Sequence, residues 1–372
     1  MRINIFLIPF VIIVGLFFVN YDNRRNRRLY IIICSSVLLV VAAMRSPEFM
    51  TYTYLIDTLG YKDLFEQCID ISWQEFGFLI IERLQGVSDE DIGFVVFLRI
   101  IAFFTHDFYI YSIIADLFFF VPFGIILYRY CTSVRQIIFA YVFYIAMIQI
   151  LFLGGGRQNI AVGFDLMALL SIIDGKKVRT IVLFLIGVTI HFSSFLFIAP
   201  LLMIWFGVGP KTLKIMHVVL FVLFPIALVM PNQIVSFMGV LSGVERYAQY
   251  GAGDALGSAY TFIILIELLS LFCLLAIKKR DLSDNNIRFF YVMVPLFTFL
   301  APLIRSNGAI IRVSFYFHLF LTILVPFGID CMFSEKDRKI AYFVSIAALA
   351  FLALRNGGIQ YYFFWQINNY HG

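Results

Sequence analysis

The sequence predicts an all-α polytopic membrane protein with about twelve transmembrane helices and an external loop that carries amphipathic helices. Of the 372 residues, 62% are hydrophobic and only 14% are charged, and a soluble domain of this length could not bury so many apolar side chains. Apolar runs of roughly 15 to 22 residues recur, the length that an α-helix needs to cross a hydrocarbon core. Short alternating segments between turn signals, typical of a β-barrel, are absent. We therefore expect one integral membrane domain over residues 1–372.

The apolar runs, taken in chain order, place the helices. They are predicted at about 4–20, 29–44, 108–128, 136–152, 157–173, 179–191, 192–207, 215–230, 259–277, 287–304, 312–329 and 340–354. The first run lacks a basic leader and a small-residue cleavage site, so it is predicted to be a retained helix rather than a signal peptide. The five cysteines lie far apart and only Cys68 falls in an external loop, so no structural disulfide is expected.

Basic loops set the predicted orientation. The segments DNRRNRR, DGKKVR, KKRD and SEKDRK fall on one side of the predicted topology, which the positive-inside rule makes the cytoplasmic side. The external side then holds both termini and the segments 45–106, 153–156, 231–258, 305–311 and the turn at His191. Lysine dominates the cytoplasmic loops, whereas nearly all external or embedded cations are arginine. Arginine favours bidentate phosphate recognition, although ordinary surface solvation is the alternative explanation.

Two external segments are long enough to build a binding surface. In residues 45–106 the stretch EFGFLIIERL is predicted to lie at the interface as an amphipathic helix. Residues 231–258 carry glycines, tyrosines and charges that suit a loop over a sugar chain. The predicted substrate-loop residues are Arg45, Tyr54, Arg246, Tyr247 and Tyr250.

Arg157 is the strongest candidate for ligand binding. It follows Gly154, Gly155 and Gly156 at a predicted helix start, where free backbone N–H groups, the helix dipole and a guanidinium can all face one anion. The alternative is an interfacial arginine that reaches toward lipid head groups. Asp165, two turns deeper, is expected to pair with another cation, because intramembrane carboxylates usually face the protein interior.

His191 lies between two short apolar runs, at the predicted external turn. It suits proton transfer or phosphate contact near neutral pH, but a lone histidine at a helix end is often structural. The other histidines are scattered without ligand spacing, so no metal is expected.

Arg305 and Arg312 bracket a further external turn, SNGAII. Two arginines at one turn can clamp the phosphates of a diphosphate, although interface anchoring is the alternative. Asp116, Arg99 and Glu267 stand in apolar surroundings and are first expected to be internal ion pairs or hydrogen-bond partners.

No nucleotide-binding glycine motif, nucleophile triad or nucleic-acid surface is present, so no cofactor and no nucleic-acid partner are expected. An activated sugar would then arrive on a lipid diphosphate rather than on a soluble nucleotide.

Several of these segments resemble the EpsG/Wzy-type polysaccharide polymerases. GGGRQNIAVGFDLMALL and the later HFSSFLF are similar to that family's R-Q-x-[IL]-A helix and H-x-S turn. EFGF at Glu75 to Phe78 is similar to its E-P-G-F segment, and RVSFYF from Arg312 resembles its late R-x-x-x-Y-F helix start. The order and spacing agree over most of the chain.

One departure concerns the loop after the second helix. The family often has an arginine, then G-T-D and a tyrosine, whereas here Arg45 leads into SPEFMTYTY, so Thr51 occupies the aspartate position and Tyr52 or Tyr54 matches the tyrosine. The base that activates the acceptor is therefore left open, with Glu48, Asp57 and Glu75 as the candidates.

The resemblance implies a GT-C-like membrane glycosyltransferase, an O-antigen or capsule polymerase of the bacterial inner membrane. Such enzymes move a growing glycan from undecaprenyl diphosphate onto a new lipid-linked repeat unit at the periplasmic face, without metal or nucleotide. The implied partners are the lipid-linked donor and acceptor, membrane lipid and a chain-length regulator protein. In the implied site Arg157, Arg305 and Arg312 with Gly155 and Gly156 bind diphosphate, and His191, Glu75 and Asp57 are the catalytic candidates. An O-antigen ligase and a flippase for lipid-linked sugars remain the alternatives.

Overall fold

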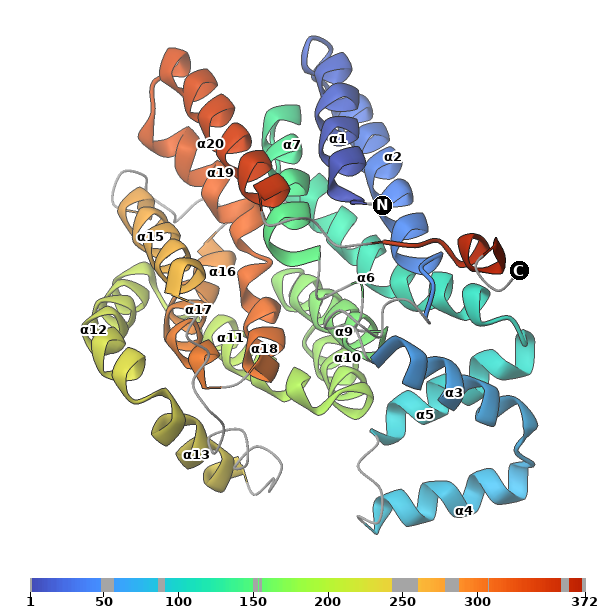
Figure 1. Ribbon diagram of the computed structural model, residues 1–372. Coiled ribbons are helices and arrows are strands. Elements are labelled where there is room, and N and C mark those ends of the chain that lie inside the picture. Colours follow the sequence, from blue (N-terminus) through green and yellow to red (C-terminus); the bar gives the residue numbers. More distant parts are fainter. Residues whose placement is uncertain are drawn as a thin grey trace. The chain divides into compact units, whose positions relative to one another are not determined.

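The computed structural model describes residues 2–47, 57–85, 91–149, 153, 156–242, 260–277, 288–306, 308–355 and 361–369 (Figure 1). Within these ranges the secondary structure is helical, and an isolated antiparallel β-bridge joins Arg45 and Phe363. The chain is an all-α membrane protein, as predicted.

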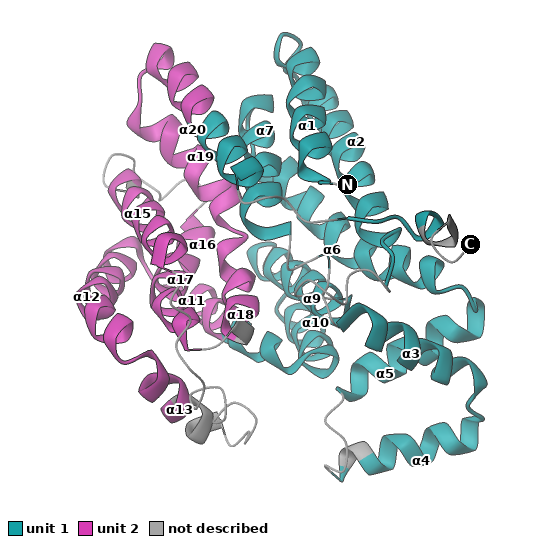
Figure 2. Cartoon of the chain, in the orientation of Figure 1, with its two compact units in different colours: residues 1–198, 345–372 teal, residues 199–344 magenta. Residues whose placement is uncertain are grey.

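The chain forms two compact units, coloured separately in Figure 2. Unit 1 holds residues 1–198 and 345–372, and unit 2 holds residues 199–344. The single membrane domain over residues 1–372 stays a prediction.

Unit 1 consists of helices. Its elements are α1 (Asn4–Val19), α2 (Arg24–Ala43), α3 (Asp57–Asp70), α4 (Trp73–Leu84), α5 (Ile92–Phe104), α6 (Phe108–Tyr130), α7 (Val134–Phe143) with the π-helix η2 (Tyr144–Ile148), α9 (Gly156–Ile173), α10 (Lys177–Ile190), and the 3₁₀ helices η3 (Phe192–Phe197) and η7 (Phe364–Asn369).

Unit 2 contains the remaining helices. They are α11 (Ile198–Trp205), which begins at the end of unit 1, α12 (Pro210–Val229), α13 (Pro231–Ser242), α15 (Tyr260–Ile277), α16 (Arg288–Tyr291), α17 (Met293–Leu300), η6 (Pro302–Arg305), α18 (Gly308–His318), α19 (Leu321–Met332) and α20 (Glu335–Arg355), whose last turns belong to unit 1.

Polar residues placed directly before apolar runs start several helices. The side chain of Asn23 accepts a hydrogen bond from the Asn26 amide at the start of α2, and Asp107 accepts from two amides at the start of α6. Ser133 accepts a hydrogen bond from the Gln136 amide at the start of α7. Such caps satisfy amides that have no partner inside the helix.

Helices occupy all twelve regions where the sequence predicts them, but fewer meet the length and hydropathy expected of a complete span. Four do: Arg24–Ala43, Phe108–Tyr130, Pro210–Val229 and Arg288–Arg305. A fifth is obtained if Ile310–His318 and Leu321–Met332, which meet at a 43° bend, are counted together. The number of about twelve transmembrane spans therefore stays a prediction.

The long segment 45–106 contains three described helices, α3, α4 and α5. The predicted amphipathic helix is α4, which exposes Trp73, Phe78 and Ile81. Its position at the membrane interface stays a prediction. In the segment 231–258, the structure describes α13, and residues 243–258 lie outside the described residues.

The core of unit 1 brings α9 close to α6. A Cβ added at Gly163 of α9 would lie 2.0 Å from the carbonyl oxygen of Phe118, so only glycine permits this approach. Around it, the rings of Phe65 and Tyr111 stack with centroids 5.1 Å apart. This packing fixes α9, which carries the polar side chains of the site.

Candidate functional site

Two clusters of polar side chains in unit 1 each include a residue of α9. This helix packs against α6 on one side and α10 on the other. It carries Arg157, Asn159 and Asp165. Residues two positions apart on a helix point to different faces, so Arg157 and Asn159 serve two separate clusters.

The first, the Asp91 cluster, consists of Asp91, Arg157 and His191. Arg157 Nη1 lies 3.3 Å from Asp91 Oδ2, and His191 Nδ1 lies 3.2 Å from the same oxygen. The amide of Phe192 donates to Asp91 Oδ1 at 3.4 Å. One carboxylate thus holds the two residues that the sequence singled out.

The side chains of the Asp91 cluster remain partly accessible. Their exposed fractions are 16% for Arg157, 19% for Asp91 and 20% for His191. A ligand can therefore contact the guanidinium and the imidazole in the folded protein. A carboxylate can accept a hydrogen bond from this ring when Nδ1 carries a proton, so the contact fits the tautomer of His191 that is protonated at Nδ1.

Helix ends position this cluster. Asp91 is the N-cap residue of α5 but makes no capping hydrogen bond there, so its carboxylate is directed to other partners. His191 is the C-cap residue of α10, where its amide donates to the Gly187 carbonyl at 2.9 Å. The extended backbone at both caps turns these side chains out of their helices.

Sequence reasoning did not identify Asp91. The local signal was a run of polar residues, SDED, directly before the apolar run of α5. Such a residue is ordinarily interpreted as a helix cap. Its contact with His191 spans 100 positions in the chain, and no local pattern predicts that contact.

The second, the Arg45 cluster, consists of Arg45, Asp116 and Asn159. Asn159 Nδ2 donates to Asp116 Oδ1 at 2.6 Å, and Arg45 Nη1 lies 3.7 Å from Asp116 Oδ2. Arg45 also donates to the Ala42 carbonyl and, at 3.4 Å, to Thr58 Oγ1. The side chains of Arg45 and Asp116 are only 4% and 2% exposed. These contacts give Arg45 a structural explanation, and its substrate-loop role stays a prediction.

The C-terminal segment packs beside the Arg45 cluster. The Ser46 amide donates to the Tyr362 carbonyl at 2.8 Å, and the Phe364 amide donates to the Met44 carbonyl at 3.2 Å. The Tyr361 hydroxyl donates to the Val41 carbonyl, and burial raises the pKa of Tyr361. The ring of Phe364 stacks on Tyr109 at 4.1 Å. Two distant parts of the chain thereby fix the end of α2.

Asp165 is buried deeper in α9. Its Oδ2 accepts a hydrogen bond from Ser194 Oγ at 2.6 Å. Within the described residues its hydrogen-bond partner is thus a hydroxyl rather than the expected cation. A Cβ added at Gly187 would lie 2.9 Å from Ser194 Oγ and 3.2 Å from Asp165 Oδ1, so this glycine makes room for the pair.

Of the predicted glycine cradle, the structure describes Gly156, whereas Gly155 lies outside the described residues. A Cβ at Gly156 would lie 3.2 Å from the Tyr61 ring and 3.3 Å from the Tyr111 hydroxyl. Close packing therefore accounts for Gly156, and anion binding by these glycines stays a prediction.

Glu75 forms a capping box at the start of α4. The Ser72 amide donates to Glu75 Oε2 at 2.9 Å, and the Glu75 amide donates to Ser72 Oγ at 3.2 Å. These hydrogen bonds lower the pKa of Glu75. The capping hydrogen bonds give Glu75 a structural role, and its catalytic role stays a prediction. Asp57 is the half-buried first residue of α3, and its catalytic role stays a prediction.

In unit 2, Arg305 has contacts of its own. Its Nη1 donates to the Leu228 carbonyl near the end of α12 at 2.5 Å, and its guanidinium lies 4.4 Å from the ring centroid of Tyr260. Arg312 is half-buried on α18. Diphosphate binding by these two arginines stays a prediction. Tyr54, Arg246, Tyr247 and Tyr250 lie outside the described residues.

The described ranges hold no group of three or more His, Cys, Asp or Glu side chains that could bind a metal ion. All five cysteines are free.

Comparison with known proteins gives one match. A family model described as the EpsG family matches residues 49–366, which includes both clusters except Arg45. No curated protein and no solved structure matches the chain.

Proposed function

Since the chain belongs to the EpsG family, the family of Wzy-type polysaccharide polymerases, we propose that it joins undecaprenyl-diphosphate-linked oligosaccharide repeat units into O-antigen or a capsular or exopolysaccharide. The protein would act in the bacterial inner membrane with its site at the periplasmic face. The family match supports the polymerase class, and the external position that the basic loops predict for Arg157 and His191 supports the orientation.

The proposed reaction is an inverting glycosyl transfer. A hydroxyl at the non-reducing end of the new repeat unit attacks the anomeric carbon of the growing glycan. The bond from that carbon to the diphosphate oxygen breaks, a glycosidic bond forms on the opposite face, and undecaprenyl diphosphate leaves. The hydroxyl proton passes to a base on the protein.

Arg157 is the residue proposed to stabilise the departing diphosphate. Negative charge develops on the leaving oxygen, and a guanidinium fixed beforehand stabilises that charge without reorganising. The contact of Arg157 with Asp91 fixes the guanidinium, while its partial exposure leaves it accessible to the ligand.

His191 is the proposed proton acceptor. Asp91 holds Nδ1, and this contact orients the ring and assigns the acceptor role to Nε2. The carboxylate also stabilises the imidazolium that forms when the proton arrives. The observation that carries the proposal is therefore the single carboxylate, Asp91, that contacts both the cation and the imidazole.

The test is complementation of a deletion strain with Arg157→Lys. Lysine keeps the charge but loses the planar two-point geometry, so most long-chain glycan should disappear while the protein level stays normal. Arg129→Lys is the matched control, because Arg129 makes a two-point ion pair with Asp174 elsewhere in unit 1. It should leave the ladder of chain lengths unchanged.

The deletion strain itself separates the functions. A single repeat unit on the cell surface supports a polymerase. Free polymer on the carrier lipid would indicate a ligase, and cytoplasmic accumulation of repeat units would indicate a flippase. If folded Arg157→Lys protein gives a normal ladder of glycan chain lengths, Arg157 does not belong to the site.

A further inference from the structure

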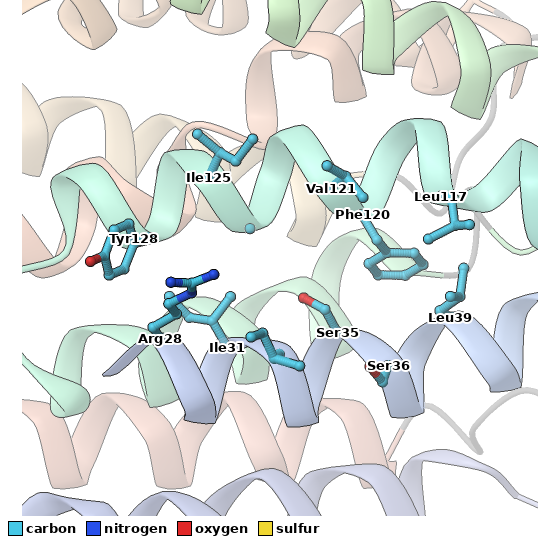
Figure 3. A pocket seen from close by; sticks show the side chains of 12 residues that line it. Arg28, Ile31, Ser35, Ser36, Leu39, Leu117, Phe120, Val121, Ile125 and Tyr128 are labelled. Atoms are coloured by element: carbon cyan, nitrogen blue, oxygen red, sulfur yellow. The ribbon is translucent and has the colours of Figure 1, made fainter. Parts of the chain in front are cut away.

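A groove of about 390 Å³ runs between α2 and α6 (Figure 3). Its walls are mostly aliphatic and aromatic, with Leu39 and Leu117 toward one end. Arg28 and Tyr128 lie at the other end. The groove is thus apolar along its length and carries its cation at one end.

Small residues create this groove. Ser35 and Ser36 of α2 and Gly124 of α6 line it. A Cβ at Gly124 would lie 3.3 Å from the Ile31 side chain, so the two helices approach closely there. The Ser35 hydroxyl is hydrogen-bonded to the Tyr141 hydroxyl at 2.7 Å, and most of the other lining side chains are apolar. The depression therefore suits a hydrocarbon chain better than a polar ligand.

The length of the groove matches one membrane leaflet. It extends along α2 from Arg28 to Leu39. Eleven helical steps at about 1.5 Å each give about 16 Å, and half of a hydrocarbon core of about 30 Å is about 15 Å. An acyl chain that starts at the Arg28 end would reach the bilayer midplane near Leu39.

The charged end is available for a head group. Of the arginines at the start of α2, Arg27 donates to the Cys131 carbonyl and pairs with Asp22, and Arg24 lies over the Tyr128 ring. Arg28 is exposed and makes no hydrogen bond or ion pair within the described residues. It lines the groove, so its guanidinium is placed to meet an anionic head group.

We propose that the groove binds one anionic phospholipid of the cytoplasmic leaflet, with its phosphate at Arg28 and an acyl chain along α2 and α6. The charge at the mouth complements an anionic head group, and juxtamembrane arginines attract such lipids. The basic turn before α2 is on the predicted cytoplasmic side. The proposed glycan donor carries its diphosphate at the opposite face, so the occupant is a structural lipid rather than the carrier.

The test uses the purified full-length protein in nanodiscs of equimolar phosphatidylglycerol and phosphatidylcholine, followed by native mass spectrometry of the retained lipid. Wild-type protein should retain phosphatidylglycerol preferentially. Arg28→Gln should lower that preference by about fivefold. Arg25→Gln is the matched control, because Arg25 lies in the same basic turn but does not line the groove, and it should keep the preference.

A second variant tests the acyl-chain position. Ser36 is exposed within the groove, so Ser36→Phe can fill it without disturbing the core, and retention of both lipids should fall. Val40→Phe adds the same bulk to an exposed position of α2 outside the groove and should retain lipid normally. Equal losses from Arg25→Gln and Arg28→Gln, no effect of Ser36→Phe, or displacement of the phospholipid by added undecaprenyl phosphate would each overturn the proposal.

Discussion

The Asp91 cluster and the Arg45 cluster use the same chemistry in two different environments. Each pairs an arginine with an aspartate, at 3.3 Å in the first and 3.7 Å in the second, and each takes one residue from the start of α9. The side chains of the Asp91 cluster are 16–20% exposed, whereas Arg45 and Asp116 are almost fully buried.

We propose that this difference in exposure distinguishes a structural cluster from the candidate site. A buried ion pair costs desolvation and is retained where it fixes a structure, because removing one partner leaves an uncompensated charge. A partly exposed pair with an imidazole on the same carboxylate can exchange contacts with a ligand. We therefore interpret the Arg45 cluster as the support of α2, α6 and α9, and the Asp91 cluster as the site.

The largest expected effect is on stability. Asp116→Ala leaves Arg45 buried without its counter-charge and should lower the free energy of unfolding by about 3–5 kcal/mol. Thermal unfolding of the purified protein, followed by size-exclusion chromatography, measures it. Asp174→Ala removes the partner of the exposed Arg129 and should cost less than about 1 kcal/mol. Equal losses from the two variants would remove the distinction between buried and exposed pairs.

The next effect is on activity alone. Asp91→Asn keeps the shape of the side chain but removes the charge that orients His191 and Arg157. Polymer formation should fall about 100-fold or more, as expected when a proton-transfer group is disabled. The unfolding temperature should stay near that of the wild type, because the cluster is partly exposed. A destabilised Asp91→Asn protein would instead make the Asp91 cluster a second structural support.

A smaller effect is expected at the C-terminal segment. Tyr361→Phe removes the hydroxyl that bonds the Val41 carbonyl and should cost about 1 kcal/mol of stability, the usual contribution of one hydrogen bond. Polymer length should not change. If the ladder changes while the unfolding temperature does not, the segment acts in the reaction rather than in support of α2.

The smallest effect is expected at Glu75. Its pKa is lowered in the folded protein, so its stabilising contribution is present at neutral pH and is lost as pH falls through the folded value. Glu75→Gln keeps the capping hydrogen bonds and should give wild-type polymer. Its stability should depend less on pH in the acidic range than that of the wild type. Loss of polymer in a folded Glu75→Gln protein would indicate that Glu75 has a catalytic role.

Much of the fold could be predicted from the sequence, because apolar runs and capping residues mark helices locally. The candidate site could be predicted only in part. Arg157 and His191 stood out as polar residues in apolar surroundings, but Asp91, which joins them, is far from both in the chain. Arg45 and Arg157 differ in burial. The sequence alone does not give this difference, because burial depends on packing by distant segments such as residues 361–364. Helix lengths also depend on packing, and several predicted spans coincide with described apolar helices of 10–17 residues.

The most direct measurement of the central claim uses purified wild-type and Arg157→Lys protein in nanodiscs with one defined undecaprenyl-diphosphate-linked repeat unit. The yield of polymer and the anomeric configuration of the new linkage, read by NMR, are compared. We predict an inverted linkage from the wild type and at least about a 100-fold lower rate from Arg157→Lys. A retained linkage, or equal rates from the two proteins, would contradict the account.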